Sequence, residues 1–283
     1  MVGWKHAFYH SDLRNTVFLS FGRYFAANTT RMAGHSKWAN IKHRKAAQDK
    51  KRAKIWTRII KEITIAARDA GGDVDTNPAL RLSIQNAKGS NMPKDTMDRA
   101  VKKGLGGEGA DLQPLVYEGY AANGVAVVIE TMTDNPNRTV ANIRLIFSKT
   151  GGSLGTNGSL SFIFSQKGVF TISMEALKGM QQDDFELSII EGGAEELDWN
   201  ETFVEVVTSF EDFGLMQRTL DDLNVEIESA DLQRLPNNTV SLNLEDALTT
   251  LQTVERFEDN EDVTNVYHNL ELTSDLMEAL NNS

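Results

Sequence analysis

The chain has 283 residues, of which 40% are hydrophobic and 24% are charged, and these ordinary values exclude wholesale disorder. A chain of this length exceeds what one hydrophobic core usually organises, so two or three compact units are expected. The absence of cysteine excludes disulfides, thiolate nucleophiles and cysteine-ligated zinc. No run of eighteen apolar residues occurs in the sequence, so we expect no membrane partner.

The net charge of -11 conceals a strong segregation of charge along the chain. Residues 32–103 carry 17 Lys and Arg against 7 Asp and Glu, whereas residues 168–283 carry 4 against 27. Residues 104–167 are close to neutral, with 4 basic and 5 acidic side chains. Such asymmetry suggests a basic head that faces a polyanion, joined to an acidic body. The alternative is that charge merely varies among solvated faces.

Residues 1–31 contain Arg14, Arg23 and Arg31, several aromatic residues and a single acid, Asp12. They lack the continuous apolar stretch of a secretory signal. An organellar presequence and a start codon assigned upstream of the true one both stay open as explanations. We expect this extension to lie outside the fold.

The basic head is predicted to form three helices. Between residues 46 and 70 apolar side chains recur at intervals of three and four, basic side chains occupy the opposite faces, and two glycines follow as a stop. A second helix spans 77–89, with Asn77 and Pro78 as cap and first-turn proline, and a third spans 93–103. Short links between these amphipathic helices predict a small bundle.

Strands and helices alternate beyond a glycine-rich linker at 104–109. This alternation suggests two α+β sandwiches with antiparallel sheets, although the sequence does not fix which strands pair. Strands are predicted at 125–132, 159–164, 169–173, 202–208, 225–235 and 263–268, and helices at 135–147, 183–191, 210–223 and 244–257.

Two glycine-rich segments resemble phosphate-binding loops only superficially. Residues 104–109 satisfy GxGxxG, but a helix precedes them where a dinucleotide site needs a strand. Residues 151–158 lack the GK[ST] of a Walker A loop. Their amides could cradle an anion, and the alternative that we favour is a flexible, hairpin-like connection into the next strand.

No cofactor, metal or small-molecule substrate is expected, and no catalytic residue is identified. The five histidines show no metal-ligand spacing, and no nucleophile stands beside a base. Asp134, Asn135 and Asn137 faintly resemble a calcium loop, but Pro136 and Arg138 occupy the next ligand positions. We interpret the Asn-Pro pair as a helix cap.

The residues that carry chemistry form a basic cluster interspersed with one tryptophan. Lysine and arginine release counterions when they bind phosphate, and the tryptophan could either stack on a base or pack on the helical bundle. The alternative is a solvated face without a partner. The predicted nucleic-acid-binding residues are Lys37, Trp38, Lys42, His43, Arg44, Lys45, Lys50, Lys51, Arg52, Lys54, Arg58 and Lys61.

Residues 32–49, MAGHSKWANIKHRKAAQD, resemble the start of proteins of the YebC/PmpR family. The resemblance covers residues 32 to about 275. Further matching segments are NMPKDT at 91–96, YEGY at 117–120, DNPNRT at 134–139, FSKTGGSLG at 147–155 and VYHN at 266–269.

This resemblance implies a multi-domain α+β fold: an N-terminal three-helix bundle followed by two α+β domains, the third ferredoxin-like and inserted in the second. The expected boundaries are 32–110 for the basic head, 111–167 plus 237–283 for the second domain, and 168–236 for the acidic third domain.

The resemblance also implies a non-enzymatic, DNA-binding regulator of transcription in the cytoplasm. The alternative that it leaves open is a ribosome-associated translational activator that binds ribosomal RNA. A protein-binding scaffold and an enzyme are contrasting classes, and the salt dependence of nucleic-acid binding separates the scaffold from the first two.

Overall fold

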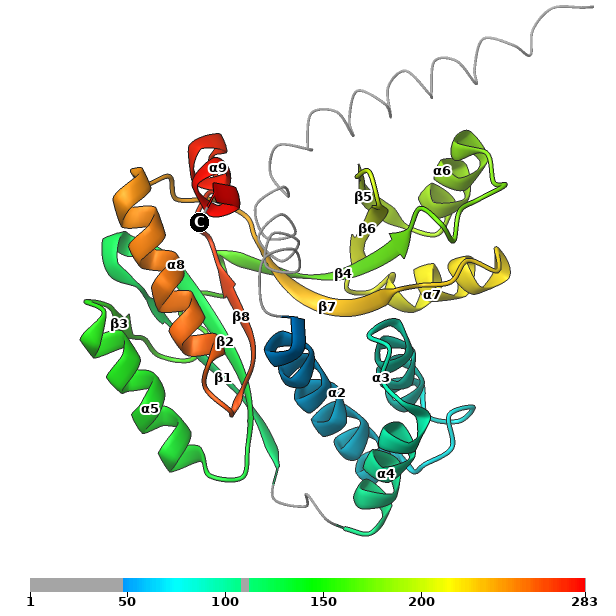
Figure 1. Ribbon diagram of the computed structural model, residues 1–283, viewed down its shortest axis with the longest axis horizontal. Coiled ribbons are helices and arrows are strands. Elements are labelled where there is room, and N and C mark those ends of the chain that lie inside the picture. Colours follow the sequence, from blue (N-terminus) through cyan, green and yellow to red (C-terminus); the bar gives the residue numbers. More distant parts are fainter. Residues whose placement is uncertain (1–47, 108–111, 283) are drawn as a thin grey trace, which may run out of the picture.

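The computed structural model describes residues 48–107 and 112–282, and these form a multi-domain α+β fold with eight α-helices and two antiparallel sheets (Figure 1). The predicted α+β class and antiparallel sheets are confirmed. The three head helices end close to where the sequence predicted. They are α2 (Gln48–Ala70), α3 (Pro78–Gly89) and α4 (Lys94–Leu105).

The head is held together by the apolar stripes of its three helices. Ile59 and Ile63 of α2 pack with Leu80 of α3 and Met97 of α4 in one buried cluster. Asn77 caps α3 by accepting the Leu80 amide at 3.0 Å, and its side chain donates to two carbonyls at the end of α2. This cap fixes the turn between the first two helices because it satisfies backbone groups that the helices leave free.

The first sheet has the strand order β3-β1-β2-β8, and α5 and α8 cover one of its faces (Figure 1). Phe147 of α5 and Phe257 of α8 meet over this face, with ring centroids 4.6 Å apart. Its elements are β1 (Gln113–Tyr120), β2 (Ala126–Thr133), β3 (Ser153–Leu154), β8 (Val263–His268), α5 (Pro136–Lys149), α8 (Leu244–Glu258) and the last helix α9 (Ser274–Asn282).

The second sheet has the order β5-β6-β4-β7, and its strands lie in sequence between β3 and β8 of the first sheet. Strands and helices follow one another as βαββαβ, and the two helices share a buried core with the sheet. Its elements are β4 (Phe164–Ser173), α6 (Gln182–Glu191), β5 (Ala194–Trp199), β6 (Phe203–Ser209), α7 (Phe213–Asp222) and β7 (Ser229–Pro236).

Two predicted strands differ from the structure. Residues 159–163 form turns, and the strand starts only at Phe164, because the buried carboxylate of Glu118 binds amides of this loop. The strand predicted at 225–235 begins at Ser229, since Val225 and Ile227 are buried in the core as irregular chain. The sequence reasoning also missed β1, β3, β5 and α9.

Candidate nucleic-acid interface

The predicted interface residues fall into three groups. Lys37, Trp38, Lys42, His43, Arg44 and Lys45 lie outside the described residues. Lys50, Lys51 and Arg52 belong to the first two turns of α2, where the backbone alone is described. Lys54, Arg58 and Lys61 follow along the same helix with their side chains described.

Lys54 is an exposed cation of α2. Burial of part of its side chain lowers the pKa of its amine from the ordinary value, and Asp259 nearby acts in the opposite direction. A long side chain of this kind can cover apolar surface with its stem while its amine stays in water. Lys54 is therefore available to a polyanion.

Arg58 is engaged by both sheets. Its Nη1 donates to Asn265 Oδ1 of β8 at 2.8 Å, and its guanidinium forms ion pairs with Glu62 at 3.2 Å and with Asp231 of β7 at 3.5 Å. Burial by itself would lower the pKa of Arg58, but the neighbouring carboxylates outweigh burial and raise it. Arg58 thus joins α2 to the body of the protein.

A charged junction surrounds Arg58, and we define it as Arg58, Glu62, Glu130, Asp231 and Arg234. Glu130 of β2 accepts from Arg234 Nε of β7 at 2.9 Å, which joins the two sheets directly. Burial raises the pKa of Glu62, and Arg58 opposes this shift. Partly buried charges that satisfy one another in this way fix how the three elements meet.

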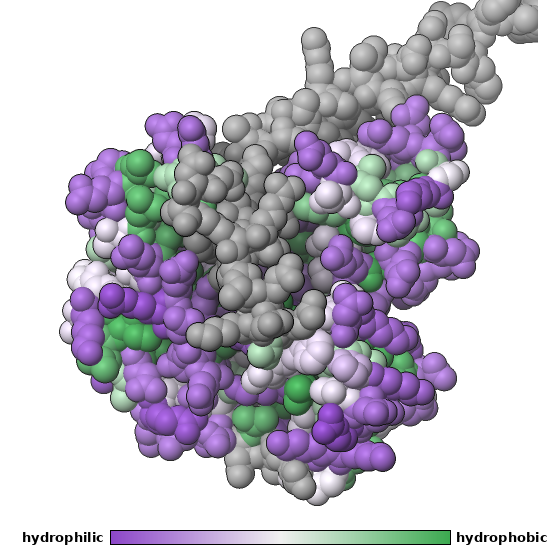
Figure 2. Space-filling view, in the orientation of Figure 1, coloured by the Kyte–Doolittle hydropathy of each residue, from purple (hydrophilic) through white to green (hydrophobic). Residues whose placement is uncertain are grey.

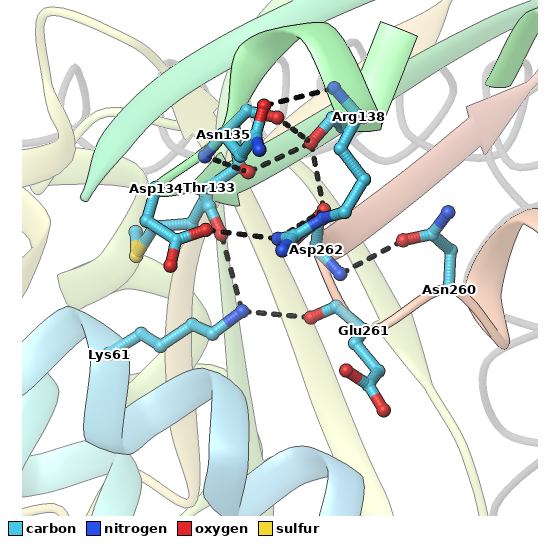
Figure 3. A network of polar contacts seen from close by, with 10 residues as sticks. Lys61, Thr133, Asp134, Asn135, Arg138, Asn260, Glu261 and Asp262 are labelled. Carbon is cyan, nitrogen blue, oxygen red and sulfur yellow. Dashed lines mark hydrogen bonds and ion pairs between the residues drawn. The ribbon is translucent and has the colours of Figure 1, made fainter. Parts of the chain in front are cut away.

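Lys61 contacts the first sheet through backbone carbonyls. Its amine donates to Met132 O at 3.2 Å and to Glu261 O at 2.8 Å (Figure 3). Burial lowers the pKa of Lys61, while Asp262 and Asp134 act to raise it. Lys61 therefore secures the middle of α2 against the ends of β2 and β8.

Beside Lys61, the segment at 134–139 forms a helix start. Asn135 Oδ1 accepts the amide of Arg138 at 3.1 Å, so the Asn-Pro pair caps α5 as predicted. The nearly buried Asp262 accepts from Arg138 at 2.9 Å and from the hydroxyl of Thr139 at 2.7 Å (Figure 3). These contacts tie the start of α5 to the loop before β8.

The glycine-rich loop after α5 does cradle an anion, and that anion is a side chain of this protein. Glu118 of β1 is buried, and its carboxylate accepts the amides of Gly158 at 3.0 Å and Leu160 at 2.7 Å. The hydroxyl of Ser159 lies 3.4 Å from the same carboxylate. Residues 155–160 are thereby folded onto β1, in place of the flexible connection that we favoured.

The head contacts the second sheet through α3. Asn86 pairs with the backbone of Ala230 in β7: Asn86 Nδ2 donates to the carbonyl and Oδ1 accepts the amide, both at 3.0 Å. A Cβ on Gly89 would lie 1.8 Å from Glu228 O, so only glycine permits this approach. The side-chain amide of Asn86 thus occupies hydrogen-bonding groups of an edge strand that would otherwise be free to pair.

Sequence reasoning missed Glu118, Asn86 and Glu130. Glu118 lies within the matched segment 117–120, which was the one signal that pointed to it. Asn86 sits within a helix, where a buried amide at an apolar position could have marked a contact. Glu130 follows four apolar residues of β2, and the cost of burying a charge predicts a cationic partner for it.

The surface over the head, α6 and α7 is mostly hydrophilic on the face shown in Figure 2, with hydrophobic residues scattered among the polar ones. Within residues 48–107 and 112–282, no three His, Asp or Glu side chains gather in a way that could hold a metal ion. No helix of that same part is long and apolar enough to cross a membrane.

The comparisons with known proteins agree over most of the chain. The family model for the N-terminal domain of TACO1/YebC proteins matches residues 36–107, and the model for the second and third domains matches residues 112–270. A probable transcriptional regulatory protein of Amoebophilus asiaticus is 52% identical over 241 residues, which are 84% of this chain and 98% of that protein. Another of Idiomarina loihiensis is 47% identical over 88% of this chain and 99% of its own length.

A solved structure also matches. The crystal structure of a conserved hypothetical protein from Aquifex aeolicus has a TM-score of 0.73 and 37% sequence identity, and the match covers 83% of this chain and 96% of that one. The family models, the identity to the relatives and the shared fold lead to the same conclusion. The chain belongs to the TACO1/YebC family.

Proposed function

We propose that this protein is a non-enzymatic regulator of transcription that binds DNA through its basic head. The names of the relatives, probable transcriptional regulatory proteins at 42–52% identity, support the regulator role. The observation that supports DNA binding most strongly is the charge of residues 32–103, which hold 17 basic and 7 acidic side chains in a chain of net charge -11.

The division of labour that we propose follows the three parts of the chain. The head, residues 32–110, binds the phosphate backbone through the basic residues that precede Arg58. The second domain and the inserted, ferredoxin-like third domain position the head, because both contact it through α2 and α3. We place this activity in the cytoplasm.

The test is a charge reversal at the start of α2. Lys50, Lys51, Arg52 and Lys54 are replaced together by glutamate, and binding to duplex DNA is measured over a series of salt concentrations. We expect weaker binding and a shallower salt dependence, by about 0.9 in the log-log slope for each duplex phosphate that the variant no longer binds. Unchanged affinity in a folded variant would refute the role of the head.

The matched control is Lys178→Glu in the third domain, where the lysine side chain is 73% exposed. This change should leave DNA binding almost unaltered, since Lys178 lies outside the head. A second measurement addresses specificity: a promoter-specific regulator should prefer one duplex roughly 1000-fold or more over competitors at physiological salt. Tight binding to ribosomes without any duplex preference would instead favour translation.

A further inference from the structure

Phe162 is the most exposed of the large hydrophobic side chains in the described residues. Its exposed fraction is 72%, against 59% for Leu105 and 51% for Leu145. Leu160 and Phe164, two residues away on either side, are buried in a cluster on the face of the first sheet that lies opposite α5 and α8. The aromatic ring of Phe162 therefore adds little to the core, and folding does not account for it.

The backbone that carries Phe162 is fixed at both ends. On one side, the carboxylate of Glu118 holds the amides of Gly158 and Leu160. On the other side, Asn237 donates from Nδ2 to the Phe162 carbonyl at 3.2 Å and from its own amide to Ile163 O at 2.7 Å. An exposed aromatic ring on an ordered turn loses little conformational entropy when a partner covers it.

The chemistry around the ring suits a nucleic acid. Residues 150–166 contain no charged side chain, although 24% of the whole chain is charged; exposed Lys149 precedes the stretch, and Lys167 after it is paired with Glu195. Exposed Thr156 and Asn157 offer hydroxyl and amide groups in the same loop. The loop therefore contributes no exposed carboxylate of its own that would repel phosphate, since the Glu118 carboxylate that it binds is buried, and an aromatic face accepts any unpaired base by stacking.

We propose that Phe162 is a stacking platform for an unpaired base of single-stranded nucleic acid, a second contact point on the body of the protein. This inference rests on the proposed function, because the basic head supplies the electrostatic part of the binding. Phe162 supplies a part that does not depend on salt, since its ring carries no charge. Bases within a duplex are already stacked on one another and are closed to it.

The experiment compares Phe162→Leu, which keeps an apolar side chain without an aromatic face, with Phe162→Tyr, which keeps the face. Affinity of the full chain is measured for a short labelled RNA strand, the DNA strand of the same sequence, and the DNA duplex. Phe162→Leu should weaken binding to single strands roughly tenfold without changing the salt slope. Phe162→Tyr should bind as the unaltered protein does, and neither change should affect the duplex.

The two single strands separate the possible sources of the base. A weaker affinity for the RNA strand alone, for the DNA strand alone or for both supports the proposal and shows which kind of strand the ring stacks on. Leu187→Ala is the matched control, because this side chain is also exposed, at 49%, and lies on α6. It should leave every affinity unchanged.

Three outcomes would overturn the proposal. These are single-strand affinities unaffected by Phe162→Leu, an equal weakening of duplex binding by Phe162→Leu, and an equal weakening of single-strand binding by Phe162→Tyr. If Phe162→Leu has no effect but the head charge reversal still weakens duplex binding, the proposed function stands and this inference alone fails. If the unaltered protein binds no nucleic acid, both fail.

Discussion

Replacing Glu118 with glutamine changes one oxygen for an NH2 group and tests how the glycine-rich loop is held. The carboxylate uses both oxygens, Oε1 for the amide of Gly158 and Oε2 for the amide of Leu160. Glutamine has a single acceptor oxygen. In either orientation of its side chain, one backbone N–H faces an NH2 group and loses its partner.

The expected magnitude follows from burial. Leu160 is only 1% exposed, so water cannot replace the acceptor if the Leu160 amide loses it, whereas Gly158 is exposed and its amide can turn to water, which sets the low end of the cost. A buried donor left unsatisfied costs about 1–3 kcal/mol, with the upper end applying when the original acceptor was charged. If this cost falls on the folded loop, its opening becomes easier and the amides at 155–163 should exchange with solvent roughly 5- to 150-fold faster.

Hydrogen exchange followed by mass spectrometry on peptides covering 155–163 measures this effect locally, without a global unfolding transition. Glu191→Gln is the control, because it removes one exposed glutamate from α6 and leaves the loop intact. An exchange rate in Glu118→Gln within about twofold of the unaltered protein would show that the carboxylate does not hold the loop. Faster exchange across the whole chain would show a general loss of stability instead.

Three further changes test the contacts of the head. Gly89→Ala places a methyl group 1.8 Å from a carbonyl oxygen before β7, so it should lower the free energy of unfolding by about 1–3 kcal/mol and weaken exchange protection of α3. The control is Gly214→Ala, which should be neutral or slightly stabilising because nothing lies within 4 Å of the added methyl group. Arg58→Met leaves the carboxylate of Asp231 without its cation and should lower the free energy of unfolding in urea by about 1–3 kcal/mol. This range is reduced for solvent screening, because the arginine side chain is 25% exposed. A decrease smaller than about 0.5 kcal/mol would contradict the role of the junction. Burial raises the pKa of Glu62 above 4.5, so the folded protein holds this proton more tightly than the unfolded chain and loses stability as pH rises through the raised pKa. Glu62→Gln should therefore flatten the pH dependence of the urea midpoint just above pH 4.5, and an unchanged slope would contradict it.

Elements with strong periodicity were predictable from the sequence. The helix at 46–70 and the Asn-Pro starts of α3 and α5 follow from apolar spacing and capping, both of which depend on neighbours in the chain. The two-residue strand β3 was not predictable, because it is defined only by its pairing with β1. Polar and apolar residues alternate at the start of 159–164, as they would in a strand. Two amides of this loop nevertheless bind Glu118, which lies about forty residues earlier, and the strand begins only at Phe164.

The candidate site was predictable in composition but not in role. The sequence does not show which basic residues of the helix have a partner, because each partner belongs to another domain. Arg58 and Lys61 turn out to contact β7, β8 and the end of β2. Lys54 lies on the same helix and stays exposed.

This division bears on how strongly the head can respond to salt. Phosphate that drew Arg58 away from Glu62 and Asp231 would leave two partly buried carboxylates without their cation, so the net gain would be small. Lys61 would likewise lose its hydrogen bonds to two carbonyl oxygens. The basic residues of the predicted interface that precede Arg58 then set the limit: Lys37, Lys42, Arg44, Lys45, Lys50, Lys51, Arg52 and Lys54. If each of them met one duplex phosphate, the log-log salt slope would be about -7, whereas adding Arg58 and Lys61 would bring it to about -9. If these ten residues are the ones that bind phosphate, a slope of about -9 would mean that Arg58 and Lys61 give up their partners and the head leaves the body, whereas a slope of about -7 or shallower agrees with a head that binds while docked.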